Sequence, residues 1–221
     1  MKNRQKFAVI GAGGLGKEVL CLAQECGWHL ADFIGFIDQG DHSGEVTCLG
    51  RSFPVFEEQA FSETFPPSDE IALFPGIGSP RILAKVGRKF SAYQFPNLIH
   101  PSVSLHRESV QFGVGNIVTA GCVLTCDIRI GSLNILNIQT IVGHDVNIGS
   151  FNILNPATCV CGNVTLGDET FIGAGATILQ NLSIGSGAVI GAASLVRKPV
   201  GPGEMVYGVP AQAARQKDGK G

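Results

Sequence analysis

The stretch from Gly131 to Leu154 reads GSLNIL-NIQTIV-GHDVNI-GSFNIL, and it decides how the second half of the chain folds. In blocks of six residues, every block ends in Leu, Val or Ile, and three of the four blocks begin with glycine. A period of six fits neither the period of an α-helix nor the simple alternation of a strand. We therefore expect each block to contain a short strand and a corner, with one large aliphatic side chain pointing inward.

The same period extends well beyond these four blocks. Every sixth residue from position 112 to 196 is apolar, and glycine follows eight of these fifteen residues. One rung cannot bury its own inward side chain, so successive rungs must coil and stack on each other. The expected inward residues are Phe112, Val118, Leu124, Ile130, Leu136, Val142, Ile148, Leu154, Val160, Leu166, Ile172, Ile178, Ile184, Ile190 and Val196.

This regularity resembles the left-handed parallel β-helix of the hexapeptide-repeat acyltransferases. The resemblance implies that three blocks, about 18 residues, close one triangular coil. Residues one coil apart would then stack about 4.8 Å from each other, the spacing of paired strands. The left-handed coil comes from the resemblance alone, because parallel crossovers are usually right-handed.

The first 95 residues show a different pattern, in which strands alternate with helices. Apolar strands are expected at Lys6–Ile10, at Phe33–Ile37, which ends on Asp38, and at Glu70–Phe74. A helical pattern follows the first strand, and a second helix is expected from Arg81 to Phe90. This alternation predicts a small Rossmann-like βαβαβ domain with a parallel sheet.

The chain therefore divides into an α/β part and an all-β part. We expect a Rossmann-like domain over residues 1–95, a β-helix domain over 96–211 and a frayed polar tail over 212–221. The first boundary lies where Phe95-Pro96-Asn97 breaks the second helix, and the period of six ends at Pro199 and Pro202.

Composition excludes several classes of function. The chain has 221 residues, 44% of them hydrophobic, and a net charge of −2, which is no electrostatic footprint for nucleic acid or an anionic membrane. It has no apolar run long enough to span a bilayer, and its N-terminus lacks the features of a signal peptide. Seven cysteines without a CxxC pair favour a reducing cytoplasm over a disulfide scaffold or a zinc ribbon.

A glycine-rich loop, Gly11-Ala12-Gly13-Gly14-Leu15-Gly16, follows the first strand and precedes the first helix. This context places backbone N–H groups and a helix N-terminus beside a phosphate. Asp38 ends the second strand, where an acidic residue can take ribose hydroxyls. Three interpretations remain open: a nicotinamide dinucleotide site, a purely structural turn, and a site for a nucleotide, in particular a nucleotide-linked sugar.

His144 is the only histidine after residue 107, and it is expected at a corner. One coil after it stands Gly162, and one coil before it stands Cys126. A glycine beside the imidazole leaves room for a thioester and offers an unobstructed N–H, so a base and an oxyanion donor would lie together. The alternatives are an inert surface histidine and a Cys126–His144 nucleophile pair.

Other polar residues of the coil receive structural interpretations. Asn116, Asn134 and Asn152 stand one coil apart and predict a structural amide ladder. Cys159 and Cys161 are expected to pack. A three-histidine metal site is not expected, because the coil has one suitable histidine, so no metal is predicted.

Four motifs, in order along nearly the whole chain, resemble the bacterial acetyltransferases of nucleotide-activated amino sugars and the related sialic acid O-acetyltransferases. These motifs are Gly11–Gly16, Ile99–Ser102, Gly143–Gly149 and Gly208–Ala211. The resemblance implies acetyl-CoA as the donor, a nucleotide-linked or free sugar as the acceptor, and a homotrimer with active sites between adjacent coils. It implies neither a nucleic-acid partner nor membrane insertion.

Mapped by motif, His144 matches the general base and Asp145 the acidic residue that raises its basicity. Asn137 matches an asparagine that reaches the site from the neighbouring subunit, and Gly162 matches the amide that binds the acetyl carbonyl. The implied nucleotide-sugar contacts are Gly13, Gly14, Leu15, Asp38, Gln39 and Ile77. The implied acetyl-CoA contacts are Ala174, Ala192 and Ile153.

Two positions depart from the family pattern. Members that act on amino sugars usually carry a histidine near acetyl-CoA where this chain has Ile153, and often a loop histidine where it has Leu15. The expected function is acetyl-CoA-dependent acetylation of an amino group on a nucleotide-linked sugar for surface-glycan biosynthesis. The alternatives are O-acetylation of sialic acid or a related sugar, and a non-catalytic protein that binds a nucleotide sugar.

Overall fold

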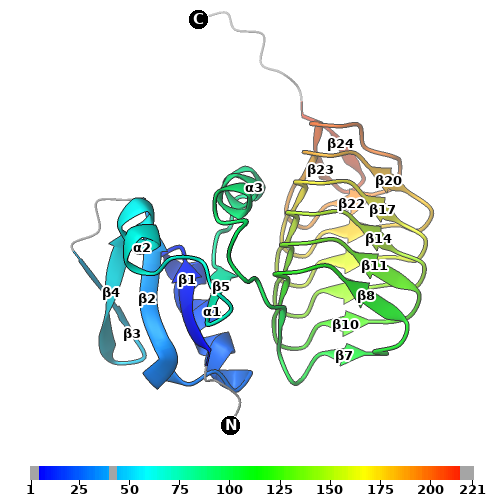
Figure 1. Cartoon of the computed structure of the whole chain (residues 1–221). Coiled ribbons are helices and arrows are strands. Elements are labelled where there is room, and N and C mark those ends of the chain that lie inside the picture. Colours follow the sequence, from blue (N-terminus) through cyan, green and yellow to red (C-terminus); the bar gives the residue numbers. More distant parts are fainter. Residues whose placement is uncertain (1–4, 40–43, 215–221) are drawn as a thin grey trace, which may run out of the picture.

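A computed structural model describes residues 5–39 and 44–214. Figure 1 shows two bodies side by side, a small sheet with helices and a coil of short parallel strands. No helix within these residues is long and apolar enough to cross a membrane.

The first body is built on a five-stranded sheet with the order β3-β4-β2-β1-β5. Its strands are β1 (Lys6–Ile10), β2 (Phe33–Asp38), β3 (Glu45–Cys48), β4 (Arg51–Glu57) and β5 (Ile71–Pro75). The helical elements are α1 (Gly14–Glu25), the 3-10 turn η1 (Leu30–Asp32), α2 (Glu58–Thr64) and α3 (Pro80–Lys89). All neighbouring strands are parallel except β3 and β4, which form an edge hairpin. The predicted Rossmann-like fold is thus confirmed.

The sequence did not predict β3, β4 or α2. Pro54 stands in the middle of β4, where it obscures a strand pattern, and α2 has only seven residues. Elements this short show no clear period.

The second body is a parallel β-solenoid with three sheets. The first sheet contains β7 (Ser104–Leu105), β10 (Val123–Leu124), β13 (Ile141–Val142), β16 (Cys159–Val160), β19 (Thr177–Ile178) and β22 (Leu195–Val196). The second contains β8 (Val110–Phe112), β11 (Ile128–Ile130), β14 (Asn147–Ile148), β17 (Thr165–Leu166) and β20 (Ser183–Ile184). The third contains β6 (Leu98–Ile99), β9 (Ile117–Val118), β12 (Ile135–Leu136), β15 (Ile153–Leu154), β18 (Phe171–Ile172), β21 (Val189–Ile190), β23 (Met205–Gly208) and β24 (Ala211–Ala213).

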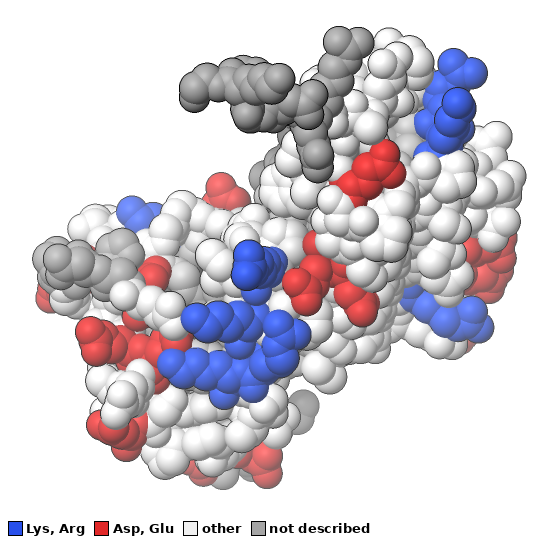
Figure 2. Space-filling view, turned by 90° about the horizontal axis from the view of Figure 1, so that it is seen from above, with Lys and Arg blue, Asp and Glu red and all other residues white. Residues whose placement is uncertain are grey.

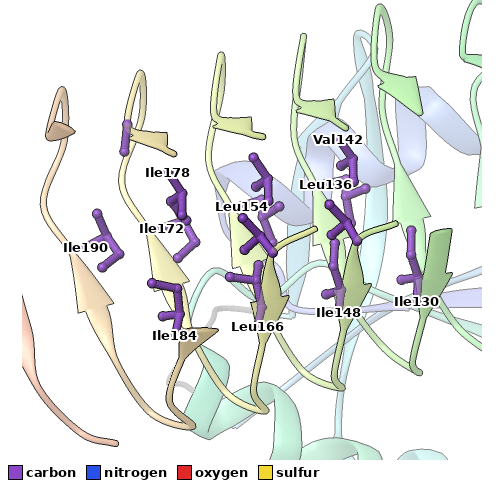
Figure 3. Close-up of a cluster of buried hydrophobic side chains, with 14 of the residues drawn as sticks. Ile130, Leu136, Val142, Ile148, Leu154, Leu166, Ile172, Ile178, Ile184 and Ile190 are labelled. Carbon is purple, nitrogen blue, oxygen red and sulfur yellow. The ribbon is translucent and has the colours of Figure 1, made fainter. Parts of the chain in front are cut away.

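The strand register confirms the predicted period. Ile135 pairs with Ile153, and hydrogen bonds such as that from Asn134 to Asn116 join residues 18 positions apart. Fourteen of the fifteen predicted inward residues are at most 4% exposed, and Phe112 is partly buried. Figure 3 shows these aliphatic side chains filling the interior of the coil in columns.

A polar column inside the solenoid forms the predicted amide ladder. Asn116, Asn134 and Asn152 are completely buried. Asn134 Nδ2 donates to Asn116 Oδ1 at 2.9 Å, and Asn152 Nδ2 donates to Asn134 Oδ1 at 3.0 Å. The Thr170 hydroxyl donates to Asn152 Oδ1 at 2.7 Å. The ladder therefore satisfies buried polar groups along successive coils, as buried groups require.

The two bodies pack through an apolar face. Ile117, Ile135 and Ile153 project outward from the third sheet, yet each is at most 1% exposed. They share one apolar cluster with Val19 of α1 and Leu83 of α3. The cluster fixes the N-terminal domain on the third sheet and leaves the corner that carries His144 exposed.

The end of the chain differs from the prediction. Residues 212–221 were expected to form a frayed tail, but β24 pairs antiparallel with β23 and places Gln212 opposite Tyr207. The pairing supplies backbone partners that the polar sequence does not reveal. Residues 215–221 of the predicted tail lie outside the described part of the chain.

The ladder predicts a specific loss of stability. Asn134→Ala removes the partner of buried groups on both Asn116 and Asn152, so it should cost about 2–3 kcal/mol and lower the melting temperature by several degrees. Thr165→Ala, at an exposed outward position of β17, is the matched control and should cost less than about 0.5 kcal/mol. Thermal melts that fail to separate the two variants would show that the ladder does not stabilise the coil.

Candidate active site

His144 and Asp145 lie together at the corner between β13 and β14. Their side chains are 64% and 59% exposed, and His144 Nδ1 lies 2.7 Å from Asp145 Oδ2. Asp145 has φ 58°, a left-handed conformation that aspartate tolerates and that turns its side chain beside the ring. Against an ionised carboxylate, Nδ1 is the donor and Nε2 keeps its lone pair. This arrangement suits a general base.

Gly162 lies directly against the His144 ring. The pairing of β13 with β16 puts these residues opposite each other on adjacent coils, as predicted. A Cβ atom added to Gly162 would stand 2.5 Å from His144 Nε2 and 2.6 Å from Cε1. Gly162 is buried although it lies at a corner. Only glycine therefore allows the imidazole its observed position.

The backbone N–H of Gly162 is available to a ligand. The corner between the second and third sheets serves as a comparison, because serine hydroxyls occupy the N–H groups there. The Val114 N–H donates to the Ser132 hydroxyl, and the Ser132 N–H donates to the Ser150 hydroxyl. Within the described residues, the N–H groups of His144 and Gly162 donate to no protein group. The corner that carries the histidine thus keeps free donors, which a developing oxyanion needs.

Cys126 gives no support to the nucleophile interpretation. It is exposed one coil before His144, and its carbonyl accepts a hydrogen bond from the Asp145 N–H at 3.1 Å. In the part of the chain described, no hydrogen bond joins its thiol to the His144 ring. Burial raises the pKa of the Cys122 and Cys159 thiols, so neither favours a thiolate.

Asn137 lies at the other end of β13 from His144. Its side-chain oxygen accepts a hydrogen bond from the Ile138 N–H at 2.8 Å. Ala174 and Ala192 are exposed on that same side of the first sheet, on two successive coils. One chain therefore does not bring these three residues to the His144 corner.

Ile153 occupies a different environment from the one expected. It is 1% exposed and packs in the apolar cluster between the solenoid and the N-terminal domain. The residue faces outward from the third sheet, but the N-terminal domain covers that face. We therefore assign Ile153 to domain packing and leave it out of the acetyl-CoA site.

A pocket of about 310 Å³ lies at the carboxyl ends of β1 and β2 and gathers most of the predicted nucleotide-sugar residues. Gly13, Asp38, Gln39 and Ile77 all line it. Gly14 is the first residue of α1 and has open space where a Cβ would stand, and the Leu15 side chain would lie 3.8 Å from a Cβ added to Gly78. Neither Gly14 nor Leu15 is part of the pocket wall.

Asp38 holds the loop that borders this pocket. One carboxylate oxygen accepts the Ala12 N–H at 2.7 Å and the other accepts the Gln39 N–H at 2.7 Å. The Gln39 amide donates to Glu58 at 2.7 Å, and Lys89 forms an ion pair with the same carboxylate. The sequence analysis missed Glu58 and Lys89, because nothing local indicates that α2 and α3 meet here.

The glycines of the loop divide into two groups. A Cβ on Gly16 would stand 1.9 Å from the Gly11 carbonyl oxygen, and one on Gly11 would stand 2.5 Å from the Gly76 carbonyl oxygen. Gly13 and Gly14 have nothing within 4 Å, and no side chain caps the N-terminus of α1. The first group serves packing, whereas the second leaves backbone open to a phosphate.

A second groove, of about 410 Å³, borders the His144 corner on the second sheet. Asp145 and Asn163 line it beside Asp127, Arg129 and Asn147. The sequence analysis did not single out Arg129 or Asn147. Their 18-residue spacing in the outward column of the second sheet is the signal that would have found them.

Comparisons with known proteins show which proteins this chain is similar to. The family model described as the PglD N-terminal domain matches residues 6–90. PerB from Caulobacter crescentus, in complex with CoA and GDP-perosamine, is 30% identical over 95% of this chain and 97% of that chain, with a TM-score of 0.83. A histidine variant of perosamine N-acetyltransferase from the same organism is 29% identical over 96% and 97%, with a TM-score of 0.84.

A third solved structure extends the match to another genus. The acetyltransferase domain of PglB from Neisseria gonorrhoeae, in complex with acetyl coenzyme A, is 29% identical over 96% of this chain and 100% of that chain, with a TM-score of 0.83. No curated protein sequence gives a significant match. The solenoid, the corner at His144 and the pocket beside Asp38 are thus found in a chain that belongs to the hexapeptide-repeat sugar acetyltransferases.

Proposed function

We propose that this protein transfers the acetyl group of acetyl-CoA to the amino group of a nucleotide-linked amino sugar. The observation that carries the proposal is the His144–Asp145 pair held against Gly162 at an open corner. Two similar structures support the substrates, since one contains CoA with GDP-perosamine and the other contains acetyl coenzyme A.

The reaction uses this corner in one displacement. The lone pair of the neutral sugar amine attacks the thioester carbonyl carbon while His144 Nε2 takes a proton from that nitrogen. The Gly162 N–H stabilises the oxyanion. The C–S bond then breaks, and the imidazolium returns its proton to the leaving CoA thiolate. Asp145 keeps Nδ1 protonated and stabilises the charged ring throughout.

The two substrates occupy different parts of the protein. The nucleotide lies in the pocket bordered by Asp38 and Gln39, with a phosphate near the open backbone at Gly13 and Gly14. Acetyl-CoA lies along the coil, with Ala174 and Ala192 beside it. Small residues at these two corner positions support this placement, because they let a long ligand approach the backbone.

The active form is a homotrimer. Asn137 and His144 stand at opposite ends of β13, so a site that uses both side chains needs a neighbouring copy. Exposed apolar side chains on this side of the coil, Val123, Ile138 and Ile141, support such an interface. Analytical ultracentrifugation should give three copies per particle, and a stable active monomer would contradict the trimer.

A reducing compartment fits the cysteine chemistry. All seven cysteines are free thiols. This supports a cytoplasmic enzyme, where thiols stay reduced.

The proposal predicts both a substrate and a catalytic residue. With acetyl-CoA and a panel of nucleotide amino sugars and sialic acids, thiol release should accompany acetylation of a nucleotide amino sugar. His144→Ala should lower kcat on that acceptor by about 10²- to 10⁴-fold without changing the fold, because its side chain is exposed and outside the core. Asp145→Asn should cost less, since the imidazole remains.

Two controls separate the alternatives. Cys126→Ser should keep nearly full activity, whereas a thiolate nucleophile would make it almost as damaging as His144→Ala. If sialic acid is the only acceptor that is acetylated, the enzyme is an O-acetyltransferase and the proposed N-acetylation is wrong. If no acceptor is acetylated and acetyl-CoA does not bind, the remaining alternative is a non-catalytic protein that binds a nucleotide sugar.

A further inference from the structure

Helix α3 concentrates positive charge on a chain whose net charge is −2. Its ten residues, PRILAKVGRK, include four cations and no acidic residue. Arg81, Lys85, Arg88 and Lys89 are all exposed. Figure 2 looks down on this helix and shows Lys and Arg side chains gathered on the N-terminal domain beside the solenoid.

Arg81 and Lys85 do not stabilise the helix, whereas Arg88 and Lys89 lie in its last turn, where the helix dipole favours a cation. Arg81 stands in the first turn, where the positive end of the helix dipole disfavours a cation. Arg81 and Lys85 are four residues apart, a spacing at which like charges repel. A charge pattern that costs helix stability points to a ligand.

Two of the four cations already have partners. Lys89 pairs with Glu58 in the pocket wall, and Arg88 lies 3.9 Å from Glu169 of the solenoid. Among the described residues, Arg81 and Lys85 form no ion pair. These two are therefore the cations of α3 that an anion can reach without displacing a carboxylate.

Arg81 and Lys85 are not in the wall of the nucleotide pocket, but each is adjacent in sequence to a residue of α3 that is. Ile82 and Val86 of α3 line that pocket, and Ile82 is 53% exposed at its edge. Arg81 directly precedes Ile82, and Lys85 directly precedes Val86. Successive residues are about 100° apart around an α-helix, so both cations lie next to the pocket-lining side of α3, on its exposed side. The residues on the other side, Leu83 and Gly87, are buried. The two cations thus lie on α3 beside its pocket-lining side.

We infer that Arg81 and Lys85 bind the diphosphate of the nucleotide sugar where it leaves this pocket, at the phosphate that does not lie near the Gly13 and Gly14 backbone. The inference rests on the proposed function, which places a nucleoside in the pocket. A nucleoside diphosphate fits because its anionic end must emerge from a pocket whose walls are largely apolar. Guanidinium and ammonium groups are the side chains that bind phosphate most strongly.

CoA is the other source of phosphate in the reaction, and binding measurements distinguish the two. Isothermal titration should be done with GDP, UDP and CoA on the trimer and on three variants. Arg81→Gln/Lys85→Gln should weaken binding of the preferred nucleoside diphosphate by about 10- to 100-fold and leave CoA binding unchanged. Arg81→Lys/Lys85→Arg, which keeps both charges, should restore most of that affinity.

The matched control removes two exposed cations from the sheet of the same domain. Lys6→Gln/Arg51→Gln changes the net charge equally and should bind the diphosphate like the wild type. Added salt should weaken wild-type binding more than binding to Arg81→Gln/Lys85→Gln.

The outcomes separate failure of this inference from failure of the proposed function. A wild type that binds GDP or UDP, with an Arg81→Gln/Lys85→Gln variant of equal affinity, overturns the inference alone. If that variant loses affinity for CoA, the two cations bind the phosphates of CoA, and this result also overturns the inference. A wild type that binds neither nucleotide contradicts the nucleotide pocket itself and removes both.

Discussion

The 18-residue register of the solenoid determines which side chains lie next to each other throughout the coil. Each strand donates its backbone hydrogen bonds to the strand one coil away, so residues at that spacing must face each other. The inward aliphatic column and the asparagine ladder both enforce this register, because a slip would expose the first and leave the second without partners. The same register places Gly162 against His144. The geometry of the proposed catalytic corner is thus a consequence of the arrangement that holds the coil together.

Rigid packing also determines where the substrates can meet. The N-terminal domain is fixed on the third sheet by an apolar cluster that includes Ile117, Ile135 and Ile153. The nucleotide pocket and its two cations therefore stand at a set position relative to the coil, and the His144 corner remains open. In the proposed function, a nucleotide sugar held at Asp38 spans the distance to a His144 corner with its diphosphate and sugar. The proposed trimer supplies the corner of a neighbouring copy as well as its Asn137.

Much of this could be predicted from the sequence because solenoid contacts follow a fixed spacing. The inward residues, the asparagine ladder and the position of Gly162 beside His144 all follow from counting in sixes. The same counting does not show that the N-terminal domain covers the outward column, and the family resemblance places Ile153 at acetyl-CoA, whereas the structure packs it against that domain. Glu58 and Lys89 meet beside Asp38 only through tertiary packing of α2 and α3, which no local pattern encodes. Whether Asn137 reaches an active site depends on a second copy, which lies beyond any pattern within one chain.

In the proposed mechanism His144 and Gly162 act as one unit, and a double-mutant cycle on kcat/KM measures whether their effects are coupled. In the wild-type background, Gly162→Ala places a methyl group 2.5 Å from His144 Nε2 and should reduce kcat/KM by about 10²-fold or more. In the His144→Ala background the same methyl group occupies the space that the imidazole leaves, so Gly162→Ala should change kcat/KM by less than about 3-fold. Equal losses in both backgrounds would contradict the account, because they would show that the glycine and the histidine act independently.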